Sequence, residues 1–331
     1  MSTALITGAS GLLGGNLAHA LTAQGRRVRV LLRPGSKTFH IDDLPALERV
    51  TGDVTDPQSL LTAMQGVEQV YHCAAQVSIS RQLTGRIWRV NVLGTENVLA
   101  AARQAGVRRV VHCSSVDALG LPENSQPADE DTPWNWDRLG VETAYARTKL
   151  EAQQRTLTAA RAGQDVVVVC PTFMIGPRDP HPSSGQMILS AARSPLRLGL
   201  PGGNNFIAVE DAAAGMIAAA ERGQTGRVYI LGHQNLSYSQ MFALIEKVLG
   251  RRAPELSIPR AAACTLGAAG DLWERISGHE SPVNSALARL GFVNHFYSPA
   301  RAVAELGLPQ TPVEDAVARA AGWFRKVGML A

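Results

Sequence analysis

The stretch that decides the fold is Thr7-Gly8-Ala9-Ser10-Gly11-Leu12-Leu13-Gly14, a GxxGxxG pattern between the apolar run Ala4–Thr7 and a helical pattern. Glycine lets the backbone turn sharply and approach a ligand closely, and the start of a helix offers unpaired N–H groups to an anion. An ordinary tight turn is the alternative. Because strands and helices alternate in the chain that follows, we favour a dinucleotide pyrophosphate as the ligand. The residues expected to contact this cofactor are Gly8, Ser10, Gly11, Leu12, Leu13 and Gly14.

Outward from this turn, short apolar runs alternate with stretches of helix length. Val28–Leu32 and Val166–Cys170 are rich in valine and apolar on both faces, as strands buried in a parallel sheet are. This alternation predicts an α/β fold with a doubly wound parallel sheet, the Rossmann fold. The other expected strands are Arg49–Thr51, Gln69–Cys73 and Arg109–Cys113, and the expected helices are Leu12–Gln24, Pro57–Met64, Ile87–Ala105 and Glu142–Ala162.

The composition of the chain changes after residue 170. Proline and glycine are dense from Pro171 to Gly203, and short strands are expected near Phe206–Ile207 and Arg227–Leu231. We therefore expect a cofactor-binding Rossmann domain over 1–170. A smaller, mostly helical substrate lobe is expected over 171–331, from which segments such as 206–231 return to the sheet. The helices expected in this lobe are Val209–Arg222, Tyr238–Leu249, Arg260–Ser277 and Val313–Lys326.

The end of the second expected strand indicates which dinucleotide binds. A site for NAD usually has an acid there, which bonds the ribose 2′-hydroxyl, but residues 18–40 contain no acid. Five cations lie instead within residues 26–37. Arg33 directly follows the strand and is placed to meet a 2′-phosphate, with Lys37 and Ser10 as helpers. We therefore favour NADP(H) over NAD(H), and a solvated basic loop is the alternative.

A tyrosine and a lysine four residues apart, Tyr145 and Lys149, lie on one face of the expected helix Glu142–Ala162. An adjacent ammonium lowers the pKa of a phenol, which suits general acid/base work between an alcohol and a ketone. Ser115 follows a strand at the carboxyl edge of the sheet, where doubly wound folds place their sites, and is positioned to bond the reacting oxygen. A solvated Tyr/Lys pair and a capping serine are the alternative interpretations.

Composition and charge exclude several other classes of protein. Apolar stretches such as Ala212–Ala220 are far shorter than the roughly 20 residues of a membrane span, so we expect no membrane partner. The net charge is +4, but the cations are scattered among 28 acids and aromatic residues make up 5%, so we expect no nucleic-acid partner. Cys73, Cys113, Cys170 and Cys264 form no CxxC pair, and His72 and His112 have no further ligands at metal spacing. We therefore expect no metal, and a reduced, cytoplasmic location.

These motifs resemble those of the extended short-chain dehydrogenase/reductase family, the NAD(P)-dependent epimerases and dehydratases. The resemblance rests on the glycine turn, on HCSSVDALG around Ser115 and on Tyr145 with Lys149, and it extends through GDVTDPQSL, NVLGTENVL and CPTFMIGPRD. It covers nearly the whole chain. Within the family, the sequence is most similar to the branch of dihydroflavonol-reductase-like enzymes and hopanoid-associated sugar epimerases.

The resemblance implies a catalytic triad. Tyr145 would exchange a proton with the substrate oxygen, Ser115 would polarise that oxygen, and Lys149 would hold the nicotinamide ribose and lower the tyrosine pKa. The cofactor contacts that the family suggests are Asp53 and Val54 near the adenine, Ala74 and Ala75 near the ribose, and Pro171 and Thr172 near the nicotinamide. The substrate contacts that it suggests are Gln76, Val77, Trp134, Met174 and the loop Pro177–Gly185.

Departures from the family pattern favour a reductase. Sugar-nucleotide epimerases carry the acid that is missing after the second strand, and the matching dehydratases carry two acids after the serine, where this chain has only Asp117. We expect an NADP(H)-dependent oxidoreductase that reduces a ketone or aldehyde of a small to medium organic substrate. An epimerase or dehydratase acting on a sugar or sugar nucleotide is the alternative, and a nonenzymatic NADP-sensing protein is a remote one. A homodimer is the assembly usual among such relatives.

Overall fold

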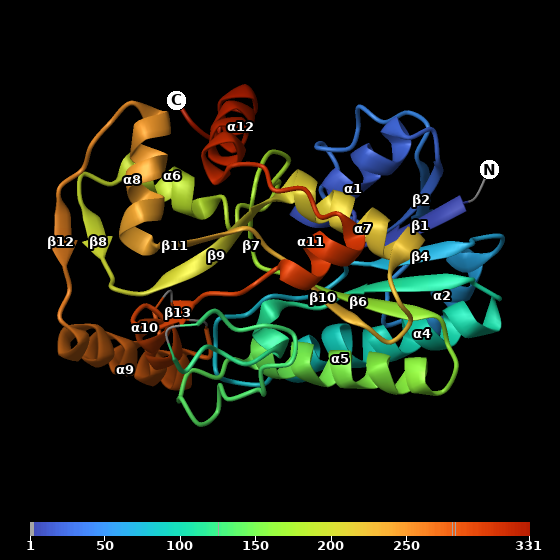
Figure 1. Cartoon of the computed structure of the whole chain (residues 1–331), viewed down its shortest axis with the longest axis horizontal. Helices are drawn as coiled ribbons and strands as arrows, with labels where there is room; N and C mark the ends of the chain where they lie inside the picture. Colours follow the sequence, from blue (N-terminus) through green and yellow to red (C-terminus); the bar gives the residue numbers. More distant parts are fainter. Residues whose placement is uncertain (1–2, 125, 280, 282) are drawn as a thin grey trace.

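A seven-stranded parallel sheet forms the centre of the molecule (Figure 1). The structure is a computed structural model that describes residues 3–124, 126–279, 281 and 283–331. The strand order β10-β6-β5-β4-β1-β2-β3 runs outward in both directions from the neighbours β1 and β4, so the doubly wound prediction is confirmed. The strands are β1 (Thr3–Thr7), β2 (Arg27–Leu32), β3 (Glu48–Thr51), β4 (Gln69–His72), β5 (Arg109–Cys113), β6 (Val166–Pro171) and β10 (Val228–Leu231).

Helices cover both faces of this sheet, which explains why its strands are apolar on both sides. β6 reads Val-Val-Val-Val-Cys-Pro and is buried along its whole length. In the view of Figure 1, one group of helices lies above the sheet and another below it. The upper group contains α1 (Leu12–Ala23), α7 (Val209–Arg222) and α11 (Ala300–Leu306), and the lower group contains α2 (Pro57–Met64), α4 (Gly94–Gln104) and α5 (Ala144–Arg161).

The stretch expected as one helix from residue 87 to 105 is divided. A short helix α3 (Gly85–Trp88) leads into a π-helical turn (Arg89–Leu93), which continues as α4. Asn91 in this turn holds a neighbouring loop: its side-chain amide donates to the Gln76 carbonyl at 2.9 Å and its oxygen accepts from the Gln76 N–H at 2.7 Å. The same amide donates to Thr148 on α5 at 2.9 Å. The π-helical turn is a local bulge in the helix, and its residue Asn91 fixes the position of the loop at Gln76 relative to α5.

Beyond residue 171 the chain contains more strands than the sequence indicated. These strands are short, and they pair with segments that are distant in the chain. The alternation of apolar and polar residues along any one of them is therefore too brief to predict a strand. One four-stranded sheet and one two-stranded sheet result. The four-stranded sheet contains β7 (Phe173–Ile175), β9 (Gly203–Ala208), β11 (Gln234–Ser237) and β13 (Asn294–His295), the pair is β8 (Arg197–Gly199) with β12 (Glu255–Ser257), and the helices around them are α6 (Gln186–Arg193), α8 (Tyr238–Leu249), α9 (Arg260–Ser277), α10 (Ser285–Leu290) and α12 (Val313–Lys326).

The chain passes between the two parts more than once. Within the segment 206–231, β10 pairs with β6 and α7 covers one face of the main sheet, whereas β9 belongs to the smaller sheet. β9 also pairs with β7, which directly follows β6, so the smaller sheet begins where a strand of the main sheet ends. The division into domains 1–170 and 171–331 stays a prediction.

Candidate cofactor and catalytic site

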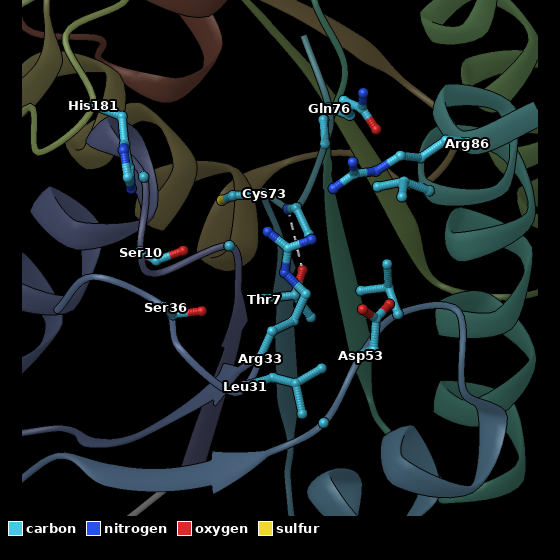
Figure 2. A pocket seen from close by; sticks show the side chains of 17 residues that line it. Thr7, Ser10, Leu31, Arg33, Ser36, Asp53, Cys73, Gln76, Arg86 and His181 are labelled. Atoms are coloured by element: carbon cyan, nitrogen blue, oxygen red, sulfur yellow. Dashed lines mark hydrogen bonds between the residues drawn. The ribbon is translucent and has the colours of Figure 1, made fainter. Parts of the chain in front are cut away.

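A cavity of about 300 Å³ opens where the central strands end (Figure 2). The glycine turn after β1 forms one wall, the ends of β2 and β3 another, and the residues after β4 a third. Of the residues predicted to contact a cofactor, those that line the cavity are Gly8, Ser10, Gly11, Arg33, Asp53, Val54, Ala74 and Ala75, and Gln76, predicted as a substrate contact, lines it as well.

The glycine turn approaches the end of β4 too closely for side chains. Gly8 has a φ of +79°, and a Cβ there would lie 2.6 Å from the Ala74 nitrogen. A Cβ on Gly14 would lie 2.4 Å from the Gly8 carbonyl oxygen. No side chain in the described part of the chain caps the start of α1 at Gly11. A tight cradle with open N–H groups at a helix start fits the pyrophosphate of a dinucleotide.

Several predicted cofactor residues lie outside this cavity lining. Leu12, Leu13 and Gly14 are buried in α1, where they hold the turn against the sheet. Lys37 is exposed and does not line the cavity. Pro171 and Thr172 are buried at the end of β6, where Thr172 donates its N–H to the Leu231 carbonyl at 3.0 Å.

Charged side chains enter the cavity from opposite sides. Arg33 and Arg86 both point toward its middle in Figure 2, and Asp53 lies on the wall between β3 and α2. One carboxylate oxygen of Asp53 accepts from the N–H and the hydroxyl of Thr55, both at 2.8 Å. The sequence predicted Arg33 because it follows a strand directly. Arg86 gave no such signal, because α3 reaches the cavity only through tertiary packing.

The loop Pro177–Gly185 brings His181 to the cavity, above Ser10 (Figure 2). Asn16 on α1 anchors this loop: it donates to the Pro177 carbonyl at 2.9 Å and accepts from Arg178 at 3.2 Å. Arg178 itself has a φ of +63°, which non-glycine residues rarely adopt. The other lining residues that sequence reasoning missed are Thr7, Leu31, Ser36, Gly52, Cys73 and Val90.

The structure brings Ser115, Tyr145 and Lys149 together at the end of β5, next to the start of α5. The Ser115 hydroxyl lies near enough to the Tyr145 phenol to lower its pKa. Ser115 also accepts from the Asp117 N–H at 3.2 Å. The Lys149 ammonium donates to the Cys113 carbonyl at 2.7 Å and lies 5.9 Å from the centre of the Tyr145 ring.

Burial dominates the electrostatics of this group. It raises the pKa of Tyr145 above its ordinary value, the Asp117 carboxylate adds to this effect, and the hydrogen bond with Ser115 offsets part of it. Burial also lowers the pKa of Lys149. The sequence predicted that the lysine lowers the tyrosine pKa; in this structure burial is the largest influence, and it raises that pKa. Tyr145 therefore holds its proton firmly and can act as a donor.

The remaining predicted substrate residues differ in how far they are buried. Trp134 is half-buried and donates from its indole nitrogen to the Asp117 carbonyl at 3.1 Å. Met174 is half-buried on β7. Val77 is exposed. Burial raises the pKa of the Asp117 carboxyl to about 6. Trp134, Met174 and Val77 come from three separate segments of the chain.

His72 and His112 lie on the neighbouring strands β4 and β5, close to each other. His72 bonds the hydroxyls of Thr7 and Thr95, at 2.8 and 3.0 Å, and its ring lies 5.4 Å from that of His112.

Within the described ranges, no group of three or more His, Cys, Asp or Glu residues is arranged to hold a metal ion. Of the helices in those same ranges, none combines the length and apolar character needed to cross a bilayer.

Comparisons with known proteins agree with this geometry. The sequence model described as "NAD dependent epimerase/dehydratase family" matches residues 4–232. A protein of Synechocystis sp. that carries the name dihydroflavonol 4-reductase is 36% identical, over 98% of this chain and 94% of its own length. Sterol demethylase protein B of Methylococcus capsulatus is also 36% identical, over 99% of this chain and 100% of its own length. The crystal structure of gox2253, 33% identical, superposes with a TM-score of 0.86 over 100% of both chains.

Proposed function

This chain belongs to the NAD dependent epimerase/dehydratase family, and on that premise we propose that it is an NADP(H)-dependent reductase of a ketone or aldehyde. The observation that carries the proposal is the cluster of Ser115, Tyr145 and Lys149 near a cavity that the glycine turn lines. A relative named dihydroflavonol 4-reductase, similar over nearly the whole chain, supports carbonyl reduction of a small to medium organic substrate. The substrate contacts that we propose are Gln76, Val77, Trp134, Met174 and the loop Pro177–Gly185.

The roles of the three residues follow from their chemistry. When bound, the cofactor supplies the hydride that reduces the carbonyl carbon. Tyr145 donates its hydroxyl proton to the carbonyl oxygen, and its raised pKa keeps that proton available at neutral pH. Ser115, close to Tyr145, donates its hydroxyl hydrogen to the same carbonyl oxygen and orients it. Lys149, held by the Cys113 carbonyl, provides a positive charge that stabilises the phenolate left after the transfer.

The preference for NADP(H) rests on one edge of the cavity. Arg33 replaces the acid that usually bonds the ribose 2′-hydroxyl of NAD, and Ser10 and Ser36 line the same cavity as hydroxyl donors. A guanidinium with two hydroxyls suits a dianionic 2′-phosphate, because charge-assisted hydrogen bonds are the strong ones. We propose that Asp53 and Val54 contact the adenine, that Ala74 and Ala75 contact the ribose, and that Pro171 and Thr172 contact the nicotinamide.

A panel of ketones, aldehydes and sugar nucleotides, assayed with NADPH and with NADH, tests the proposal. We expect one NADPH to be consumed for each carbonyl reduced, followed by the absorbance of the reduced nicotinamide. The family name favours a second candidate, an epimerase or dehydratase. Conversion of a sugar nucleotide without net change in that absorbance would establish the second candidate and refute the reductase.

A further inference from the structure

The helix α9 carries its large apolar side chains on the outside, the reverse of an ordinary surface helix. Leu266, Trp273 and Ile276 are exposed to 59%, 59% and 75%. With Ala262 before them and Ala269 between Leu266 and Trp273, they follow the i, i+4, i+7 spacing of a single stripe along the helix. Leu272, exposed to 57%, flanks this stripe. A contiguous apolar surface of this kind marks a site of interaction.

The inward face of α9 is built from small residues, which bring the neighbouring chain close. A Cβ on Gly267 would lie 2.8 Å from the Asn284 carbonyl oxygen, and one on Gly270 would lie 1.8 Å from that of Val283. The helix therefore cannot roll its large residues inward without breaking this packing. The outward stripe is a fixed feature of the fold.

The charges of α9 are arranged to suit an anionic surface. Its two acids turn inward: Asp271 accepts from the Ser285 N–H at 3.1 Å, and Glu274 is buried, bonding the Ser80 hydroxyl at 2.9 Å. Its two cations, Arg260 near the first turn and Arg275 near the last, are exposed. The exposed part of this helix thus has one cation near each end of its apolar stripe, while Asp271 and Glu274 bond the neighbouring chain.

The helix also lies beside the segment that leads away from the proposed substrate site. The loop after Gln76 is bonded to α9 and to the start of α10, through Ser80 to Glu274 and through the Asn284 amide to the Ile79 carbonyl at 2.6 Å. Val77 at the start of this loop is 63% exposed. In Figure 1, α9 and α10 lie together at the edge of the smaller lobe, with no helix drawn beyond α9.

We propose that α9 docks on the surface of an anionic lipid bilayer, with its apolar stripe at the boundary between headgroups and acyl chains. Helices that combine a Trp- and Leu-bearing apolar face with flanking cations lie in that plane, and anionic headgroups attract the arginines. The sequence excluded a membrane span, but an interfacial helix needs only one exposed apolar face. This inference goes beyond the reductase proposal and does not depend on it.

Flotation with lipid vesicles tests the docking surface. The full chain is mixed with phosphatidylcholine vesicles that contain or lack phosphatidylglycerol. We expect binding to the anionic vesicles, and a loss of on the order of tenfold to hundredfold in affinity for the double variant Leu266→Gln, Ile276→Gln. The matched control is Val303→Gln, which changes an apolar residue that is 40% exposed on α11 and keeps binding unchanged.

Two further measurements make the test specific. Arg260→Gln with Arg275→Gln should remove the preference for anionic over neutral vesicles. Tryptophan emission should shift to shorter wavelength when anionic vesicles are added, and Trp273→Phe should abolish that shift. Thermal unfolding and NADPH binding, compared with the wild type, establish that each variant is folded.

Two outcomes would overturn the inference. One is a wild-type chain that does not float with anionic vesicles. The other is a dimer, detected by sedimentation velocity, that dissociates in the double variant while neither protein binds vesicles, which would assign the stripe to a second copy of the chain. Activity on a water-soluble ketone should be the same for all variants, so failure of docking and failure of the reductase proposal are distinguishable.

Discussion

The cofactor side and the substrate side of the candidate site are built in different ways. Most residues of the cofactor cavity end the strands β1, β2, β3 and β4 or follow them directly, and Arg86, Val90 and His181 come from elsewhere in the chain. The substrate side that we propose combines β7, the segment around Trp134 and the loop after Gln76, which are far apart in the chain. A short motif can therefore encode a cradle for a common ligand, whereas specificity is distributed over contacts between distant segments.

The largest effect should come from Tyr145, the proposed general acid. Tyr145→Phe should lower turnover by about two to four orders of magnitude, the range for a lost general acid. Affinity for NADPH, measured by fluorescence titration, should stay unchanged, because Tyr145 does not line the cofactor cavity. Tyr229→Phe, which removes a hydroxyl bonded to Glu305 on the far part of the sheet, is the control. Unchanged turnover in Tyr145→Phe would remove this residue from the mechanism.

The glycine turn allows a matched pair of substitutions on the cofactor side. Gly8→Ala should lower NADPH affinity by about tenfold to hundredfold and the free energy of unfolding by about 1–3 kcal/mol, because its Cβ would enter the backbone of Ala74. Gly25 also has a positive φ but open space around its Cβ position. Gly25→Ala should therefore cost only about 1 kcal/mol and leave affinity alone. Equal effects of the two variants in calorimetry would show that strain, and not close approach, explains the turn.

Arg33 tests the cofactor preference directly. Arg33→Ala should weaken NADPH binding by about tenfold, the loss of one charge-assisted hydrogen bond, and leave NADH binding nearly unchanged. Lys37→Ala is the control, because this exposed lysine does not line the cavity. An unaltered ratio of the two dissociation constants in Arg33→Ala would contradict the proposed 2′-phosphate contact.

On the substrate side, a single truncation should have a smaller and more selective effect. Met174→Ala should change the KM for the substrate by about threefold to tenfold, within the range for a few methylene groups in a pocket. NADPH affinity should not change, since Met174 is on β7 and outside the cofactor cavity. If the variant weakens the binding of NADPH and the binding of substrate equally, the cofactor side and the substrate side are not separable.

The smallest effect concerns Asp117, which follows the proposed catalytic residue Ser115 by two positions. Its carboxyl pKa of about 6 in the folded chain exceeds the usual 3.8, so the folded state keeps a proton that the unfolded state releases. Stability should therefore fall as pH rises from about 4 to 6 and level off above that. Asp117→Asn should lack this decline and be more stable at pH 7 by about 1 kcal/mol, as judged by urea unfolding. Parallel pH profiles for the two proteins would exclude a buried, protonated carboxyl.

Sequence reasoning succeeded where structure depends on neighbours in the chain. The strands around Val28–Leu32 and Val166–Cys170 were recognisable because burial on both faces demands continuous apolar residues. The π-helical turn at Asn91 was missed, because its cause is a set of bonds to Gln76 and Thr148. The loop Pro177–Gly185 was predicted as a substrate contact, whereas its His181 lines the cofactor cavity, because an anchor on α1 brings the loop there.

The tyrosine illustrates the same limit in electrostatics. Tyr145 and Lys149 lie on one helix face, and spacing alone predicts that the ammonium lowers the phenol pKa. The tertiary structure adds burial and the Asp117 carboxylate, which together raise that pKa. The pairing was thus visible in the sequence, but the sign of the shift required the surroundings.

By itself, the sequence determined the doubly wound sheet, the phosphate-binding turn and the identity of the family, because each depends on residues a few positions apart. Only the tertiary structure decided which face of α9 meets solvent. The spacing of Leu266, Trp273 and Ile276 shows that they share a face, but helical periodicity is the same whether that face is buried or exposed. The close approach of Gly267 and Gly270 to the chain before α10 turns that face outward, and this contact is a property of the folded chain.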